Sequence, residues 1–186
     1  MNIGSKELGF ERKNIGLLLD QEAISRRVAA LGAELTRDYA GKYPVLIGVL
    51  KGCMVFLADL MRHIALPVEI EFLFASSYRR GINRAEDIVL GGGVEINLKE
   101  RHVLLIEGIV DSARTVSVIL DRIKKEEPAS LEVVTLLDKP ASHRHKIAVK
   151  YKGFTIGNEF AIGYGMDNTQ RFRNLPFIGK LIDRED

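Results

Sequence analysis

The stretch from Val103 to Leu120 constrains the fold more than any other part of the chain. Its first half, Val103–Val110, is apolar apart from Glu107 and Gly108, which is typical of a strand buried on both faces of a parallel sheet. A short polar loop, Asp111–Thr115, follows, and apolar residues then recur at helical spacing. This pattern predicts an anion-binding site, because free backbone N–H groups and the positive end of the helix dipole converge on the loop.

Two carboxylates, Glu107 and Asp111, stand at the carboxyl end of this predicted strand, where open α/β sheets bind ligands. Metal or ribose contacts and general-base chemistry are open for both, and capping of the following helix is a sufficient alternative for Asp111. Capping does not explain Glu107, because an unpaired carboxylate in a buried strand is costly. We therefore expect Glu107 to have a ligand, a metal ion or a basic partner. The pair predicts a magnesium-dependent reaction on a phosphorylated sugar or nucleotide.

Strands and helices alternate along the chain, which predicts an α/β fold with right-handed parallel crossovers and a sheet covered on both faces. We expect residues 1–186 to form one domain, with residues 1–13 as a loose N-terminal arm. The basic, glycine-containing segment Ser77–Asp87 has the character of a functional lid. The predicted helices are Asp20–Gly41, Met54–Met61 and the segment after Thr115; the predicted strands are Tyr43–Leu50, Pro67–Ser76, Ile88–Leu90, Val94–Ile96, Val103–Val110, Leu131–Leu137, Tyr151–Ile156 and Phe160–Tyr164.

Composition excludes several classes of protein. The 186 residues are 46% hydrophobic and 28% charged, with a net charge of +2, which describes an ordinary globular protein without a dedicated nucleic-acid surface. The single cysteine, Cys53, excludes an internal disulfide and suits a reducing compartment. No apolar run reaches membrane-spanning length, and the N-terminus lacks a signal-peptide pattern. We expect a cytoplasmic protein that binds neither nucleic acid nor membrane.

Three further features have two interpretations each. Lys51-Gly52 after a buried strand is either a turn with an exposed lysine or a loop that presents N–H groups to a second anion. Lys139 at the end of another predicted strand allows the same choice between a structural and a ligand-binding role. Phe160 is either a core aromatic or a stacking platform. Two features favour the structural interpretation. Cys53 is best explained as a small apolar residue, because no histidine lies nearby in the sequence to activate it, and His143-Arg-His145 as a solvated loop.

Together these parts resemble the hypoxanthine/guanine phosphoribosyltransferase family, from about residue 15 to residue 182. The family's phosphoribosyl diphosphate signature has two acids, two apolar residues and then Asp-Ser/Thr-Gly-x-Thr; here Glu107, Asp111, Ser112 and Thr115 match. Four further segments match in family order, namely the pyrophosphate loop at Val49–Gly52, the start of the lid at Ser76, Ser77 and Tyr78, the purine-contacting Leu136–Pro140, and Phe160–Asp167 followed by Arg173.

The resemblance implies a phosphoribosyltransferase-type fold, in which helices flank a mainly parallel sheet, terminal segments form a small hood, and a mobile lid loop closes the site. It implies transfer of a phosphoribosyl group to hypoxanthine or guanine, Mg²⁺ as cofactor, and a homodimer or homotetramer. Asp111 would be the general base. The sugar substrate would contact Lys51, Gly52, Glu107, Asp111, Ser112, Ala113, Arg114, Thr115 and Arg173, the purine Lys139, Phe160, Ala161 and Asp167, and the metal Glu107 and Asp167.

Three positions depart from the family pattern. Gly108 replaces the second acid and removes a ribose-hydroxyl contact, so an acid restored there is expected to tighten sugar binding. Ala113 replaces a glycine, and its methyl group can disfavour a left-handed backbone or crowd a phosphate, although Arg114 can add compensating charge. Asn168 stands where an aromatic is usual. Two alternatives follow: a catalytically weak relative that binds nucleotide as a regulator, and an enzyme that uses xanthine or a pyrimidine.

Overall fold

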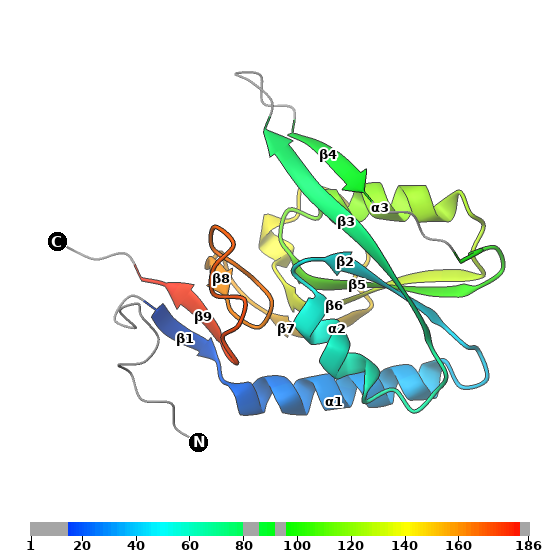
Figure 1. The fold of residues 1–186 in the computed structure, drawn as a ribbon, viewed down its shortest axis with the longest axis horizontal. Helices are drawn as coiled ribbons and strands as arrows, with labels where there is room; N and C mark the ends of the chain where they lie inside the picture. Colours follow the sequence, from blue (N-terminus) through cyan, green and yellow to red (C-terminus); the bar gives the residue numbers. More distant parts are fainter. Residues whose placement is uncertain (1–14, 80–85, 92–95, 183–186) are drawn as a thin grey trace.

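The computed structural model describes residues 15–79, 86–91 and 96–182 (Figure 1). The predicted N-terminal arm, residues 1–13, lies outside the described residues, and so do residues 80–85 of the predicted lid. None of the described helices is long and apolar enough to cross a lipid bilayer.

A six-stranded sheet forms the centre of the described structure, in the order β4-β3-β2-β5-β6-β7. Each neighbouring pair is parallel except β3 and β4, which are antiparallel. The mainly parallel sheet predicted from the sequence is therefore confirmed. The strands are β2 (Val45–Leu50), β3 (Glu69–Arg79), β4 (Glu86–Gly91), β5 (His102–Val110), β6 (Ser130–Asp138) and β7 (Tyr151–Thr155).

Helices cover both faces of this sheet, as the apolar strands predicted. Helices α1 (Gln21–Asp38) and α2 (Met54–Met61) lie on one face, and α3 (Arg114–Lys124) lies on the other (Figure 1). Leu46 and Ile106 are buried against the first pair, whereas Ile47 and Leu105 are buried with the residues of α3. Each such side chain contributes about 1.5–3 kcal/mol of apolar burial, so β2 and β5 anchor the core from both sides.

The start of α1 follows the predicted capping chemistry. Asp20 has an extended backbone, and its Oδ1 atom accepts a hydrogen bond of 2.7 Å from the Ala23 N–H. The helix ends at Asp38, slightly before the predicted stop, and Gly41 then turns the chain with a φ of +76°.

The order of the strands reverses between β2 and β5. From β2 the chain crosses through α2 to β3, whereas from β5 it crosses through α3 to β6 in the opposite direction along the sheet. The carboxyl ends of two such strands form a topological switch point, which is where open α/β sheets bind ligands. The loop at Lys51-Gly52 and the loop at Asp111–Ala113 both begin there.

A separate three-stranded antiparallel sheet has the order β1-β9-β8. Strand β1 (Ile15–Leu19) comes from the N-terminal part of the chain, and β8 (Ala161–Ile162) and β9 (Ile178–Leu181) come from the C-terminal part. This sheet confirms the predicted hood of terminal segments (Figure 1). Strand β8 is shorter than the predicted Phe160–Tyr164, because the chain turns through positive φ angles from Gly163 to Gly165.

Strands β3 and β4 form an antiparallel hairpin that projects from the rest of the sheet (Figure 1). Strand β3 extends past the predicted end at Ser76 and pairs Tyr78 with Asp87. The backbone of Ser76, Ser77 and Tyr78, predicted as the start of the lid, is therefore a strand rather than a loop. Ile96, predicted as the end of another strand, lies in a bend, and residues 92–95 are outside the described residues.

Candidate active site

A cavity of about 340 Å³ opens at the switch point, and it brings together predicted site residues from five separate segments. It is bounded by the ends of β2, β5 and β6, by β8, and by the loop that follows β8. The predicted site residues that line it are Lys51, Gly52, Glu107, Asp111, Thr115, Lys139, Phe160, Ala161, Asp167 and Arg173, joined by Val49, Leu50, Ala75, Ile109 and Met166.

Lys139 and Asp111 form an ion pair at the carboxyl ends of β5 and β6. The Lys139 Nζ atom lies 2.8 Å from Asp111 Oδ2, and the two side chains are 6% and 56% exposed. The Lys139 N–H also donates to the Val110 carbonyl oxygen, which ties the turn to β5. A buried ammonium group needs such a partner, whereas the carboxylate remains open to the cavity. Capping by Asp111, the structural alternative, is wrong, because the N-cap residue of α3 is Ala113 and the helix has no side-chain cap.

The loop before α3 has the left-handed backbone that its motif suggested. Ala113 has a φ of +63° and a ψ of 1°, a conformation that costs a residue with a Cβ atom roughly 1–2 kcal/mol. Ala113 is only 3% exposed and belongs to the same core cluster as Val116. Burial of its methyl group stabilises the fold by about 0.8 kcal/mol. Since the methyl group is used in the core, the structure does not support crowding of a phosphate. Thr115 lines the cavity, whereas Ser112 and Arg114 are not among the residues that line it.

Glu107 lies buried at the end of β5 and lines the cavity. Its Oε2 atom accepts a hydrogen bond of 3.2 Å from the Gly108 N–H. Burial raises the pKa of the Glu107 carboxyl from 4.5 to about 8, and the Gly108 hydrogen bond only partly opposes this. Within the described part of the chain no lysine or arginine forms an ion pair with Glu107. The expected basic partner is therefore not found there, which leaves a ligand or a metal ion.

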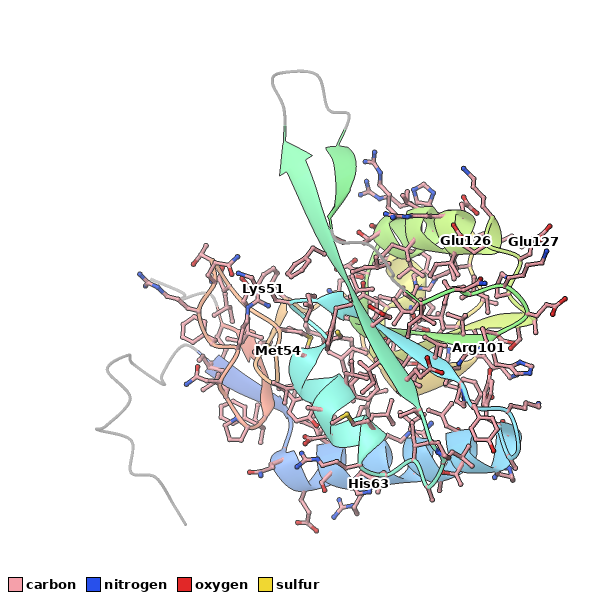
Figure 2. All side chains as sticks on the ribbon, turned by 45° about the vertical axis from the view of Figure 1, so that its right-hand side comes forward. Lys51, Met54, His63, Arg101, Glu126 and Glu127 are labelled. Atoms are coloured by element: carbon pink, nitrogen blue, oxygen red, sulfur yellow. The ribbon has the colours of Figure 1, made fainter. Side chains whose placement is uncertain are left out.

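Two further cations, Arg173 and Lys51, line the cavity. The Arg173 guanidinium donates 2.7 Å to the Gly165 carbonyl oxygen through Nη1 and pairs through Nη2 with Asp167 Oδ1, also at 2.7 Å. Lys51 follows a cis peptide bond after Leu50 and stands where α2 begins, beside the loop after β8 (Figure 2). Both positive groups therefore line the same cavity as Lys139.

Gln170, which no sequence motif indicated, joins these groups. Its Oε1 atom accepts from Lys51 Nζ at 3.4 Å and from Arg173 Nη2 at 3.3 Å, while its N–H donates to Asp167 Oδ2 at 2.7 Å. Gln170 has a positive φ of 66° in a tight turn. A polar residue in a loop without a motif gives no sequence signal, so only the spatial arrangement could reveal it.

Phe160 and Tyr164 have different surroundings. Phe160 is 55% exposed and lines the cavity, so its interpretation as a core aromatic is wrong. Tyr164 is buried, and its hydroxyl group donates to Asp59 on α2. Ala161, the first residue of β8, follows Phe160 in the chain and is buried. An exposed ring at the edge of a polar cavity is suited to stacking on a planar base.

A second layer of polar groups supports the turn that carries Lys139. Asp138 is buried and accepts from His143 Nε2 at 2.9 Å and from Lys152 Nζ at 3.0 Å. His143 is therefore part of the supporting structure, and its interpretation as a solvated residue is wrong, whereas His145 is exposed as expected. Cys53 is buried as predicted, and burial raises the pKa of its thiol to about 12, which excludes an activated nucleophile.

A larger cavity of about 600 Å³ lies on the other side of Arg173, between α1, α2 and the loop before β9. Its polar lining includes Asp59, Arg62 and His63, and the Arg62 side chain already pairs with Asp59. We place the active site in the smaller cavity, because that one contains the carboxyl ends of the parallel strands and both predicted anion loops.

Comparison with known proteins identifies the class to which this fold and site belong. Residues 14–169 match the phosphoribosyl transferase domain family, and the chain belongs to that family. It is 42% identical over 165 residues to the hypoxanthine-guanine phosphoribosyltransferase of Streptococcus pneumoniae strain R6, a match that covers 89% of this chain and 92% of the relative. It is 39% identical over 179 residues to the hypoxanthine phosphoribosyltransferase of Haemophilus influenzae, covering 95% of this chain and 100% of the relative.

Solved structures agree with this assignment. A hypoxanthine-guanine phosphoribosyltransferase of Bacillus anthracis, with a HEPES molecule in its active site, superposes with a TM-score of 0.86 at 36% identity, over 91% of this chain and 100% of that one. The hypoxanthine phosphoribosyl transferase of Trypanosoma cruzi superposes with a TM-score of 0.85 at 33% identity, over 92% of this chain and 94% of that one. The predicted phosphoribosyltransferase-type fold is thereby confirmed.

Proposed function

We propose that this protein transfers the phosphoribosyl group of phosphoribosyl diphosphate to hypoxanthine or guanine, releasing pyrophosphate and the purine mononucleotide. The observation that carries the proposal is the pair of Lys139 Nζ and Asp111 Oδ2, 2.8 Å apart in the same cavity as the exposed Phe160 ring. A donor, an acceptor and an aromatic platform in one place match the 6-oxo oxygen, the N7 proton and the flat face of a 6-oxopurine.

Purine binding changes the partners of the Lys139–Asp111 pair. Lys139 donates to the 6-oxo oxygen of the base, and Asp111, no longer neutralised by that ammonium group alone, accepts the N7 proton as general base. Phe160 stacks on the ring, while Ala161 and Asp167 complete the purine contacts. Lys139 thus selects a base with an acceptor at position 6.

Departure of pyrophosphate builds negative charge on the leaving group, which positive groups of the cavity can stabilise. The bond from ribose C1′ to the pyrophosphate oxygen breaks, its electron pair leaves with pyrophosphate, and C1′ forms a new bond to purine N9. Lys51, the Gly52 amide and Arg173 stabilise the leaving charge. Gln170 already joins the side chains of both cations, so it sets their spacing before the substrate arrives.

The loop at the start of α3 binds the 5′-phosphate. Asp111 through Thr115, including the Ser112 hydroxyl and the Arg114 charge, supply donors at the amino end of an 11-residue helix. Ser76, Ser77 and Tyr78 of β3 belong to the segment that we assign to closing the site against water, which would otherwise hydrolyse the reactive sugar.

The chemistry of the donors fits a magnesium ion. Glu107 is a buried acid that lines the cavity and forms no ion pair with a lysine or arginine of the described residues, and Asp167 lies at the same cavity. Within those residues no group of three or more histidine, cysteine or acidic side chains could hold a metal, and Mg²⁺ in phosphate sites uses only one or two protein carboxylates. When bound, Mg²⁺ neutralises pyrophosphate charge, and Glu107 and Asp167 would hold it.

We further propose a homodimer or homotetramer in a reducing compartment such as the cytoplasm. Exposed apolar side chains on α2 and β3 are candidates for the contact between copies: Met54, Met61, Phe72 and Phe74. The free, buried Cys53 agrees with a reducing environment.

A turnover assay tests the proposed function. The protein is incubated with Mg²⁺, phosphoribosyl diphosphate and one base at a time, namely hypoxanthine, guanine, xanthine or uracil, and both nucleotide and pyrophosphate are measured. We expect turnover with hypoxanthine and guanine. Nucleotide binding without turnover of any base would favour the regulator, and turnover restricted to xanthine or uracil would favour altered base choice.

A further inference from the structure

The carbonyl oxygen of Gly52 is packed between two positions that lack a side chain. A Cβ atom added to Gly108 would lie 2.6 Å from Gly52 O and 3.0 Å from its carbonyl carbon, and a Cβ atom added to Gly165 would lie 2.6 Å from the same oxygen. Real Cβ atoms essentially never approach other atoms within 3.0 Å. The loop that follows β2 therefore occupies space that exists only because β5 carries a glycine.

We propose that Gly108 is a positioning residue for the leaving-group loop. By lacking a Cβ atom it admits the Gly52 carbonyl onto β5 and so determines where Lys51 and the Gly52 amide stand in the cavity. This inference rests on the proposed function, since it assigns pyrophosphate to that loop. Where the family signature has its second acid, this chain has a close backbone approach between β5 and the loop that follows β2.

Displacement of the loop is expected to change the positions of the two pyrophosphate-binding cations, Lys51 and Arg173. Gly165 contacts the same carbonyl oxygen, its N–H donates 2.9 Å to the Arg173 carbonyl oxygen, and the Arg173 guanidinium donates back to the Gly165 carbonyl oxygen. A side chain at position 108 must push Gly52 toward Gly165, or away from β5, and either movement shifts Lys51 or Arg173. A shift of about 1 Å can reduce activity roughly 100-fold.

The other half of the site does not depend on this contact. Lys139 is tied to Val110 by its backbone and to Asp111 by its side chain, and neither interaction involves Gly52. A substitution at Gly108 is therefore expected to separate ligands by whether they carry pyrophosphate. It should weaken the binding of pyrophosphate and of phosphoribosyl diphosphate, and it should leave the binding of the purine mononucleotide unchanged.

An aspartate at position 108 reverses the expectation that the sequence alone suggested. Its Cβ atom meets the same backbone carbonyl, and its carboxylate adds negative charge beside the Gly52 oxygen. Gly108→Asp is therefore expected to bind phosphoribosyl diphosphate no better than Gly108→Ala, although it restores the residue type of the family signature.

Titration calorimetry of the full chain with Mg²⁺ tests the inference, with Gly91→Ala as matched control, because a Cβ atom there meets its neighbour at an ordinary 3.7 Å. For Gly108→Ala we expect the Kd of pyrophosphate and of phosphoribosyl diphosphate to rise about tenfold or more. The Kd of inosine monophosphate and the melting temperature should stay near those of wild type. Gly91→Ala should leave all four values unchanged.

The possible failures are distinguishable. Equal pyrophosphate binding by wild type and Gly108→Ala, or tighter binding by Gly108→Asp, would overturn the positioning role alone. Equal weakening of the mononucleotide together with a lower melting temperature would show a merely structural glycine and would also overturn it. A wild-type protein that binds neither pyrophosphate nor phosphoribosyl diphosphate would overturn the proposed function and this inference with it.

Discussion

Lys139 and Asp111 neutralise each other across the mouth of β5 and β6, with Nζ and Oδ2 2.8 Å apart. The lysine is buried and the aspartate is half exposed, so the lysine cannot leave the site, whereas the carboxylate can exchange partners. The pair keeps a buried charge compensated while the site is empty. When a 6-oxopurine arrives, its oxygen takes one hydrogen bond from the lysine and its N7 proton faces the carboxylate.

The first prediction concerns the general base. Asp111→Asn keeps the size of the side chain and an acceptor for Lys139 but cannot take a proton, so we expect kcat to fall roughly 10²–10⁴-fold. The KM for phosphoribosyl diphosphate should change far less. Asp121→Asn is a suitable control, because Asp121 lies on the exposed side of α3 and pairs only weakly with Lys124. Unchanged purine turnover in Asp111→Asn would remove the general-base role.

The second prediction concerns the recognition of the purine base by Lys139, as distinct from binding of the sugar substrate. Lys139→Met retains most of the buried volume but removes the donor for the 6-oxo oxygen, and a hydrogen bond to a charged group contributes about 1.5–3 kcal/mol. We expect kcat/KM for hypoxanthine to fall roughly 10- to 100-fold, measured at saturating phosphoribosyl diphosphate. Lys150→Met, at an exposed lysine, serves as control. A larger effect on the KM of the sugar than on that of the purine would contradict this assignment.

The third prediction concerns pH. Burial raises the pKa of Glu107 to about 8 in the folded protein, against 4.5 ordinarily. Between these values the folded chain keeps a proton that the unfolded chain has lost, so stability falls as pH rises through this window, by at most about 1.4 kcal/mol per pH unit. Urea unfolding of wild type and Glu107→Gln at pH 5, 6.5 and 8 measures the effect. The wild type should lose stability relative to the variant, and parallel pH profiles would refute the shift.

The fourth prediction concerns the left-handed Ala113. Ala113→Gly relieves about 1–2 kcal/mol of backbone strain, but it removes a buried methyl group and gives the unfolded chain more freedom, at a cost of about 0.8 and about 0.4–1 kcal/mol. The terms nearly cancel, so the free energy of unfolding should change by less than about 1 kcal/mol. Chemical denaturation measures this difference. A large loss of stability would show that the methyl group contributes more packing than its area indicates.

The sequence predicted the parts of the fold whose signals are local. The continuous apolar runs of β2, β5 and β6 predicted buried parallel strands, and the spacing after Asp20 predicted α1 with its cap. Strand β1 was not predicted, because five residues that pair only with the distant β9 carry little pattern of their own.

Site residues were predictable where a motif named them, and unpredictable where only space connects them. Asp111 and Lys139 could be named separately, but their ion pair joins residues 28 positions apart in the sequence. Gln170 and His143 act through partners on other elements. Gly108 was identified as a missing acid, whereas its close contact with Gly52 depends on how β5 and the loop after β2 meet in three dimensions.

The central claim is that Lys139 and Asp111 together recognise and activate a 6-oxopurine. The most direct measurement compares kcat/KM of the wild-type protein for hypoxanthine and for adenine, at saturating phosphoribosyl diphosphate and Mg²⁺. Adenine carries an amino group at position 6, which cannot accept a hydrogen bond from the buried Lys139 ammonium group. We predict a preference for hypoxanthine of at least about 100-fold. Equal use of the two bases, or a preference for adenine, would contradict the account.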